Sequence, residues 1–147
     1  MTLKEKLNDA MKAAMKARDN LRLSAVRMVR AAIKNREIDS RAELDDQGVI
    51  DVISTMAKQR RESIRMYLEG NRPELAEKEE SELAVLLEFL PTQLSPNEID
   101  SLVGQVILDL GAQGAKDMGR VMKAVTPLTA GKADGKRVSE TVRRLLA

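Results

Sequence analysis

The C-terminal third of the sequence contains two short segments in which glycines occur beside basic residues. These segments are residues 117–123 (DMGRVMK) and residues 131–138 (GKADGKRV). Gly119 and Gly135 each fall in the first turn of an expected helix, where glycine costs about 1 kcal/mol relative to alanine. The free amides at a helix N-terminus attract phosphate, and Arg120, Lys132 and Lys136 lie beside them in the sequence. The two segments therefore indicate a phosphate contact.

A packing role for the same glycines is also consistent with these residue types. Gly119 and Gly135 would permit close packing between two short helices. In addition, Asp117 and Asp134 are suited to cap these helices, and their carboxylates would repel a phosphate placed on the same amides. The residues alone therefore leave phosphate binding and helix packing open.

Most other side-chain chemistry is excluded, because the sequence has no cysteine and no histidine. Cysteine nucleophiles, imidazole bases and zinc sites made of thiolates or imidazoles are therefore impossible. Glu79, Glu80 and Glu82 are close in sequence, but carboxylate metal sites in helical bundles also use histidine, so a solvated acidic face is the better interpretation. The serines are scattered, and no phosphate-loop pattern occurs. We predict no catalytic residues, no metal and no cofactor.

The composition also bears on the compartment. A chain without cysteine fits a reducing compartment, and no apolar run approaches the ~18 residues of a membrane span. Glu5, Asp9 and Asp19 argue against a transit peptide. These features predict a cytoplasmic protein that does not cross a membrane.

The elements that position these residues are expected to be helices. Apolar residues make up 43% of the sequence, Tyr67 and Phe89 are the only aromatic residues, and no alternating β-branched run occurs. Capping boxes begin at Thr2 and Ser95, and apolar residues then recur every three or four positions. The sequence therefore predicts an all-α protein with seven main helices. Core-filling roles are expected for Met11, Met15, Met28, Met56 and Leu145.

Two prolines are expected to end helices, because proline cannot donate a backbone hydrogen bond. Pro127 is expected to end the sixth helix and Pro91 the fourth. The segment from Pro91 to Ser95 is also the expected domain boundary. It separates a four-helix region, residues 1–92, from a three-helix region, residues 93–147.

Charge is distributed unevenly along the chain. Residues 1–36 contain ten basic and three acidic residues, and residues 66–90 contain two basic and seven acidic residues. Two basic rows at helical spacing in the first region could meet RNA phosphates, but pairing with the acidic fourth helix is favoured. The rows are Arg27, Arg30 and Lys34, and Lys58, Arg61 and Arg65; their expected partners are Glu74, Glu77 and Glu80.

The sequence resembles the YqeY family along essentially its whole length. Five groups of residues together carry the resemblance, whereas any one alone would be weak. They are Arg22-Leu23-Ser24, Ala32-Ile33-Lys34-Asn35, Lys58-Gln59-Arg60-Arg61-Glu62-Ser63, Leu90-Pro91-x-Gln93-Leu94, and the two C-terminal segments described above.

The C-terminal third is also similar to the tail domain of the GatB subunit of the tRNA-dependent amidotransferase, which holds tRNA. The sequence departs from that domain at Met118, where an aromatic residue is usual, and at Asp134-Gly135, where Asn-Pro is usual. The matching residues are Gly119, Val121, Met122, Lys123, Gly131, Lys132 and Ala133.

The resemblance implies a YqeY-type domain over residues 1–92 and a GatB-tail-like domain over residues 93–147. It implies a non-catalytic module that binds tRNA or an aminoacyl-tRNA enzyme complex. The alternatives are a protein-interaction adapter or an accessory of an amidotransferase. If this chain were classed as a carbon–nitrogen ligase with glutamine as amido-N-donor, that class would come only from its similarity to the tail domain. The expected RNA-binding residues are Arg120, Lys123, Lys132, Lys136, Arg143 and Arg144, with motif glycines Gly119, Gly131 and Gly135.

Overall fold

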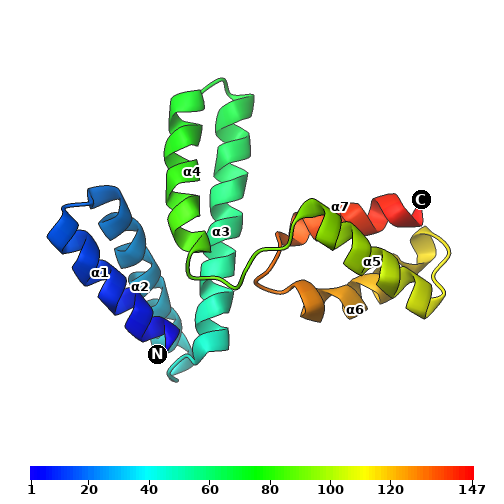
Figure 1. The fold of residues 1–147 in the computed structure, drawn as a ribbon, viewed down its shortest axis with the longest axis horizontal. Coiled ribbons are helices and arrows are strands. Elements are labelled where there is room, and N and C mark those ends of the chain that lie inside the picture. The colour runs from blue at the N-terminus through cyan, green and yellow to red at the C-terminus, as the bar shows by residue number, and fades with distance from the viewer. The chain divides into compact units, whose positions relative to one another are not determined.

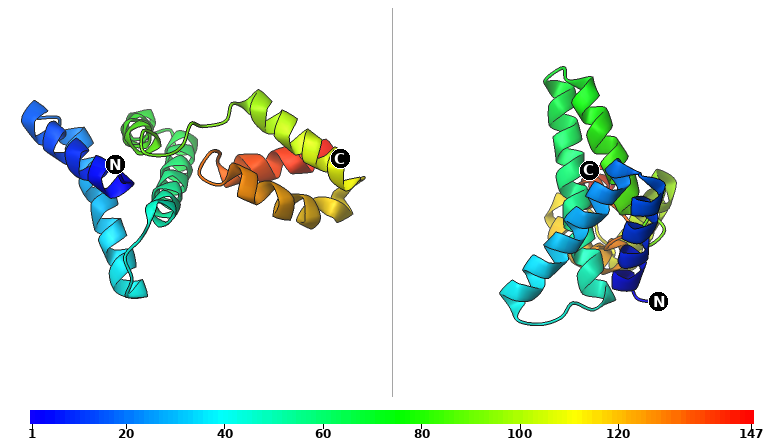
Figure 2. Two further views of the ribbon diagram at one scale, coloured as in Figure 1. Left: turned by 60° about the horizontal axis from the view of Figure 1, so that its bottom comes forward. Right: turned by 90° about the vertical axis from the view of Figure 1, so that its left-hand side faces the viewer.

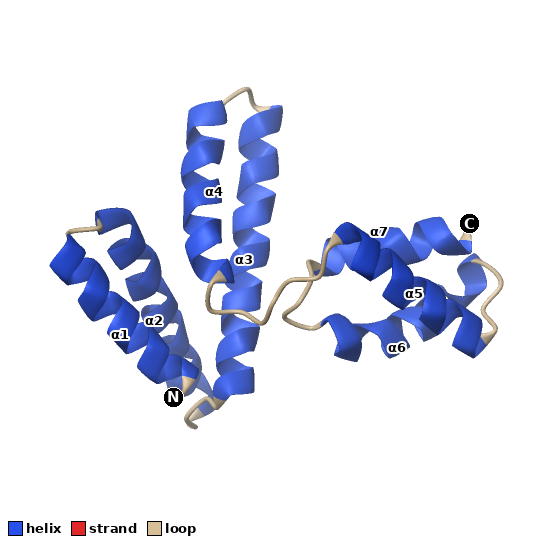
Figure 3. Cartoon of the chain, viewed as in Figure 1, coloured by secondary structure: helices blue, strands red, loops and turns tan.

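The computed structural model describes residues 1–147 and contains only helices and their connections (Figures 1 and 3). The all-α prediction is therefore confirmed. Seven α-helices and one short 3₁₀ helix follow one another along the chain. They are α1 (Leu3–Ala17), α2 (Asn20–Ser40), α3 (Asp46–Glu69), α4 (Pro73–Leu87), α5 (Pro96–Leu110), η1 (Ala115–Asp117), α6 (Met118–Thr129) and α7 (Gly135–Leu146).

The contacts within the chain divide it into two compact units, Met1–Pro91 and Thr92–Ala147. Each unit has its own core of buried aliphatic side chains. Whether these units correspond to the two domain types that the resemblance implies stays a prediction.

The first unit consists of two helical hairpins, α1–α2 and α3–α4 (Figures 1 and 2). Its core joins residues from all four helices, and the stripe of α2 contributes Val26, Val29 and Ile33. Removing such a side chain from water stabilises the fold by about 1.5–3 kcal/mol. The same periodicity places Val49 and Ile53 of α3 in this core, where both are fully buried.

Helices α1, α2 and α3 each begin at a residue whose side chain caps the helix N-terminus. Thr2 accepts a hydrogen bond from the Glu5 amide, while the Glu5 carboxylate accepts one from the Thr2 amide, which completes the predicted capping box. Asp19 caps α2 by accepting a hydrogen bond from the Arg22 amide. Asp45 caps α3 by accepting from the Gly48 amide.

The second unit packs α5, α6 and α7 around a separate aliphatic core (Figure 2). Ser95 and Glu98 form the predicted capping box, with Pro96 at the first helical position. Gly111 ends α5 in the left-handed conformation with φ +63°. The buried core residues are Ile99, Val103, Val121, Val125, Val138, Val142 and Leu146.

Both predictions about proline differ from the structure. Pro127 lies inside α6, which continues to Thr129. At this end of α6, Thr129 is buried and its hydroxyl donates to the Val125 carbonyl. The fourth helix ends at Leu87, before Pro91, and the intervening residues form a turn in which Phe89 is buried.

Three predicted core residues are instead partly exposed. Met15 and Met28 retain 50% and 44% of their accessible surface, and Leu145 retains 38%. Leu146 takes the buried position on α7, because the direction of the core relative to a helix is set by the neighbouring helices. Met11 and Met56 pack against the core of the first unit, as expected.

None of the helices combines the length and the apolar character needed to span a bilayer.

Candidate nucleic-acid interface

The two glycine-containing motifs lie at opposite ends of one helix pair. Helices α6 and α7 are joined by a short loop and run antiparallel, as Figure 1 shows. Gly119 is in the first turn of α6 and Gly135 begins α7. Because α6 has 12 residues, the two helix N-termini are separated by about 18 Å along the pair. The motifs therefore form two separate surfaces.

The alternative of helix packing through these glycines is wrong. A methyl group added at Gly119 or Gly135 would meet no atom within 4 Å, apart from neighbouring parts of its own helix. Gly119 and Gly135 are also exposed. Neither glycine is therefore required for a close contact within the chain, and the backbone at both places is open to a ligand.

The expected capping role of Asp117 is also wrong. Its carboxylate makes no hydrogen bond to the amides of α6, and accepts instead from the Gln113 amide at 2.9 Å. This hydrogen bond, aided by Arg120, holds the pKa of the Asp117 carboxyl below its ordinary value. The start of α6 thus has no side-chain cap. By contrast, Asp134 caps α7 by accepting from the Lys136 amide at 3.3 Å.

Two of the predicted RNA-binding residues are engaged within the second unit. Arg120 donates to the Leu110 carbonyl at 3.0 Å and to Asp117 at 3.3 Å, so it connects the start of α6 to the end of α5. Arg144 on α7 pairs with Asp100 on α5 at 2.6 Å. Both guanidinium groups therefore hold helices together, and any RNA contact would compete with these pairings.

Three other predicted residues are exposed and have no carboxylate partner. Lys123 lies on the outer face of α6, Lys132 in the loop before α7, and Arg143 on the outer face of α7. Sequence reasoning did not identify Arg137, which is also exposed and lies seven residues before Arg144 on α7. A helical repeat of seven between basic residues is the signal that could have revealed it.

The loop that carries Lys132 is fixed by the segment that precedes α5. The Gln93 side-chain amide donates to the Gly131 carbonyl at 2.8 Å, and the Leu94 amide donates to the Lys132 carbonyl at 2.8 Å. Gly131 has φ +75°, a left-handed conformation that favours glycine. Two of the sequence groups that carry the family resemblance thus contact each other and set the position of Lys132.

In the first unit, the expected pairing of the basic rows with α4 is wrong in its residues. Arg60, which belongs to neither row, pairs with Glu79 at 3.3 Å and Glu82 at 3.1 Å. Arg65 instead pairs with Glu62 and Glu69 of its own helix. The reason is the helical phase: Arg60 falls on the face of α3 that turns toward α4, while the predicted row lies beside it.

The other basic row remains on the surface of α2. Arg27, Arg30 and Lys34 are exposed, and none of them forms an ion pair. They line a hollow of about 560 Å³ together with Lys4 and the core residues Leu7 and Ile33. The first unit therefore presents a second basic surface.

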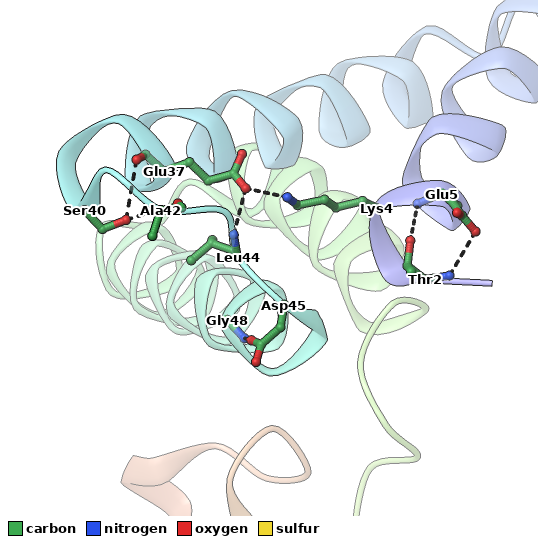
Figure 4. A network of polar contacts seen from close by, with 9 residues as sticks. All are labelled: Thr2, Lys4, Glu5, Glu37, Ser40, Ala42, Leu44, Asp45 and Gly48. Carbon is green, nitrogen blue, oxygen red and sulfur yellow. Dashed lines mark hydrogen bonds and ion pairs between the residues drawn. The ribbon is translucent and has the colours of Figure 1, made fainter.

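Lys4 and Glu37, which line this hollow, belong to a polar network that Figure 4 shows. The Glu37 carboxylate accepts from Lys4 of α1 and from the Leu44 amide before α3, the latter at 2.8 Å. The hydrogen bond from Lys4 is the main cause that holds the pKa of Glu37 below its ordinary value, followed by the one from Leu44. Lys4 is therefore neutralised locally, whereas the three cations of α2 are not.

No cluster of three or more acidic side chains with the geometry to hold a metal ion is present. The molecule combines an all-α fold with exposed cations on both units.

Comparison with known proteins gives the family. Residues 4–146 match the family described as Yqey-like protein, and the chain belongs to this family. It is 39% identical over 108 residues to "Altered inheritance of mitochondria protein 41, mitochondrial" of Kluyveromyces lactis. The matched region covers 71% of this chain and 58% of that protein. The protein of the same name in Vanderwaltozyma polyspora is 37% identical over 107 residues, with the same shares covered. That in Saccharomyces cerevisiae strain YJM789 is 30% identical over 95 residues, 64% of this chain and 51% of that protein.

These relatives correct one prediction. The chain spans 58% of the length of the first two, and all three are named as mitochondrial proteins. This finding contradicts the predicted cytoplasmic localisation. The physical reason is that the lack of cysteine indicates a reducing environment at most, and does not distinguish one such compartment from another.

Proposed function

We propose that this Yqey-like chain is a non-catalytic module that binds tRNA through its second unit. The observation that carries the proposal is the set of exposed cations without carboxylate partners, Lys123, Lys132 and Arg143, to which Arg137 is added. The phosphates of RNA are the complementary ligand, because each cation that neutralises a phosphate releases a condensed counterion. The similarity of residues 117–138 to the GatB tail domain supports tRNA as the particular RNA.

The backbone at Gly119 supports the same proposal. The α6 amides have no side-chain cap, and the space beside this glycine is open. A phosphate oxygen could approach these amides directly, with favourable alignment of the helix dipole. The carboxylate of Asp117, which seemed from the sequence to oppose such a contact, is occupied by Gln113 and Arg120.

Folded RNA fits these surfaces better than single strands. Proteins that bind single strands stack bases on aromatic side chains, and the second unit has no aromatic residue. The only two aromatic residues are Tyr67, which is half-buried, and Phe89, which is 9% exposed, and both belong to the first unit. Recognition would therefore depend on phosphate positions and on the shape of the RNA.

The test is tRNA binding by the full chain over a series of salt concentrations. Replacing Lys123 and Lys132 with alanine should reduce the slope of log affinity against log salt by about one unit for each residue. The matched control replaces Lys12 and Lys16, two exposed lysines of α1 without ion-pair partners, and should leave the slope nearly unchanged. Equal losses for both variants, or equal affinity of the wild type for tRNA, duplex DNA and heparin, would indicate a generic basic surface and contradict the proposal.

A protein-interaction adapter is the second candidate. It is favoured by exposed leucines in the second unit, of which Leu108 retains 75% and Leu128 49% of its accessible surface. Exposed apolar side chains mark a partner surface where they adjoin, and these two leucines lie on different helices, α5 and α6. Absence of any tRNA binding by the wild type at low salt would favour this candidate, including the accessory role beside an amidotransferase.

A further inference from the structure

The exposed face of α2 carries three adjoining shallow hollows that follow the helix axis. The first, of about 390 Å³, is lined by residues between Asn20 and Ala31. The second, of about 560 Å³, lies between α1 and α2 and shares Arg27 and Ala31 with the first. The third, of about 320 Å³, shares Lys34 and Glu37 with the second and extends to Glu43. Since α2 has 21 residues, the hollows together follow a surface about 30 Å long.

This surface, which we name the α2 track, is positively charged. Besides Lys4, which pairs with Glu37, its basic residues are Arg27, Arg30, Lys34 and Arg41, and none of these four has a carboxylate partner. Arg30 has only the Met11 sulfur as a polar neighbour, at 2.7 Å. The Glu37 carboxylate is already hydrogen-bonded to Lys4 and to the Leu44 amide, and Glu43 stands at the far end. The positive charge of the track is therefore not compensated within the chain.

The shape and lining of the α2 track distinguish among anionic ligands. An elongated row of cations fits a polyanion better than a compact phosphorylated molecule, which one hollow would hold. A partner helix would need adjoining apolar anchors in a pocket. The apolar floor of the central hollow, Leu7 and Ile33, is only 1% and 5% exposed, and the exposed Met28 and Ile38 lie apart, in the two outer hollows. Arginine guanidinium groups also match phosphate geometry with two parallel donors.

We infer that the α2 track is a second RNA-binding surface, which holds the phosphate backbone through Arg27, Arg30 and Lys34. This inference rests on the proposed function for the identity of the ligand, but on a different set of residues. Within about two turns of α2, these side chains present cations from Arg27 to Lys34 over about 10 Å, so they contact successive phosphates of one backbone. The contacts position the RNA and do not read its sequence.

The test uses the full chain and labelled tRNA over a salt series. The variant Arg27→Ala/Lys34→Ala should weaken binding at least about fivefold near 0.1 M salt and lower the salt slope by about two units. The control Lys16→Ala/Arg36→Ala removes the same two residue types from exposed positions of α1 and α2 that line none of the three hollows. It should retain the wild-type affinity and slope. Both variants should remain folded, because exposed charges contribute little to stability and alanine favours helices.

A third variant, Lys123→Ala/Lys132→Ala, separates this inference from the proposed function. Loss of affinity in the α2 variant but not in the third variant would support the track and contradict the proposed interface on the second unit. The reverse result would overturn the track and leave the proposed function intact. Equal losses in the α2 variant and its control would overturn the track as a specific surface. Binding of polyglutamate, reduced by Arg27→Ala/Lys34→Ala, without tRNA binding would assign the track to an acidic protein and overturn the inference.

Discussion

The side-chain amide of Gln93 donates a hydrogen bond to the carbonyl of Gly131, 2.8 Å away and 38 residues later in the chain. Together with the bond from the Leu94 amide to the Lys132 carbonyl, it fixes the loop between α6 and α7 against the segment that leads into α5. Since Gly131 has φ +75°, the geometry of this contact depends on a residue that tolerates the left-handed region.

We expect Gly131→Ala to destabilise the second unit by about 1–2 kcal/mol, because a side chain is strained at this φ. Gly104→Ala is the matched control: Gly104 lies within α5, and an added methyl group there meets nothing within 4 Å. The control should stabilise the unit by up to about 1 kcal/mol, since alanine is the better helix former. Urea unfolding followed by circular dichroism measures both, and destabilisation by both variants to the same extent would contradict this account.

Alanine at Gly119 tests whether the open backbone at the start of α6 has a binding role. The substitution should not destabilise the protein, and should stabilise it by up to about 1 kcal/mol, because the position is helical and open. If a phosphate approaches these amides, the methyl group should nevertheless weaken tRNA binding. Thermal unfolding and tRNA titration on the same variant give both values; higher stability with unchanged affinity would exclude a phosphate contact at this position.

Arg60 should be the most important charged residue for the stability of the first unit. Its guanidinium group is partly buried against Glu79 and Glu82, and Arg60→Ala leaves both carboxylates without this cationic partner. We expect a loss of about 1–3 kcal/mol. Arg65→Ala, which removes two exposed pairs within α3, should cost under about 1 kcal/mol. Tyr67 is the only tyrosine and the chain has no tryptophan, so its fluorescence reports on this unit during urea unfolding. A larger loss for Arg65→Ala would contradict the prediction.

Glu37 should give the first unit an acid-sensitive contact. Because Lys4 and the Leu44 amide lower its pKa in the folded protein, the carboxylate stabilises the fold above its ordinary pKa of about 4.5. This contribution is lost as the pH falls through the lower pKa of the folded state. Glu37→Gln should therefore be less stable than the wild type at pH 7, and the difference should shrink below about pH 4.5. Glu43→Gln, at an exposed position, is the control, and a difference that is independent of pH would contradict this explanation.

The sequence by itself determined the helices and most of their starting points. The capping boxes at Thr2 and Ser95 and the left-handed end at Gly111 involve residues within four positions of each other, so local chemistry decides them. Apolar spacing likewise predicts the stripes of α2 and α5, because helical geometry alone places these side chains on one face. The assignment of RNA-binding residues on the second unit, in contrast, stays a prediction.

Only the tertiary structure decided which charged residues are available to a ligand. Arg60 rather than its neighbours meets the acids of α4, and Arg144 reaches Asp100 while Arg143, one residue away, points to solvent. The antiparallel arrangement of α6 and α7 likewise separates Gly119 from Gly135, although both motifs look alike in the sequence. These outcomes depend on which helix faces which and at what rotation. The packing of distant aliphatic side chains sets that rotation, and spacing within one helix does not encode it.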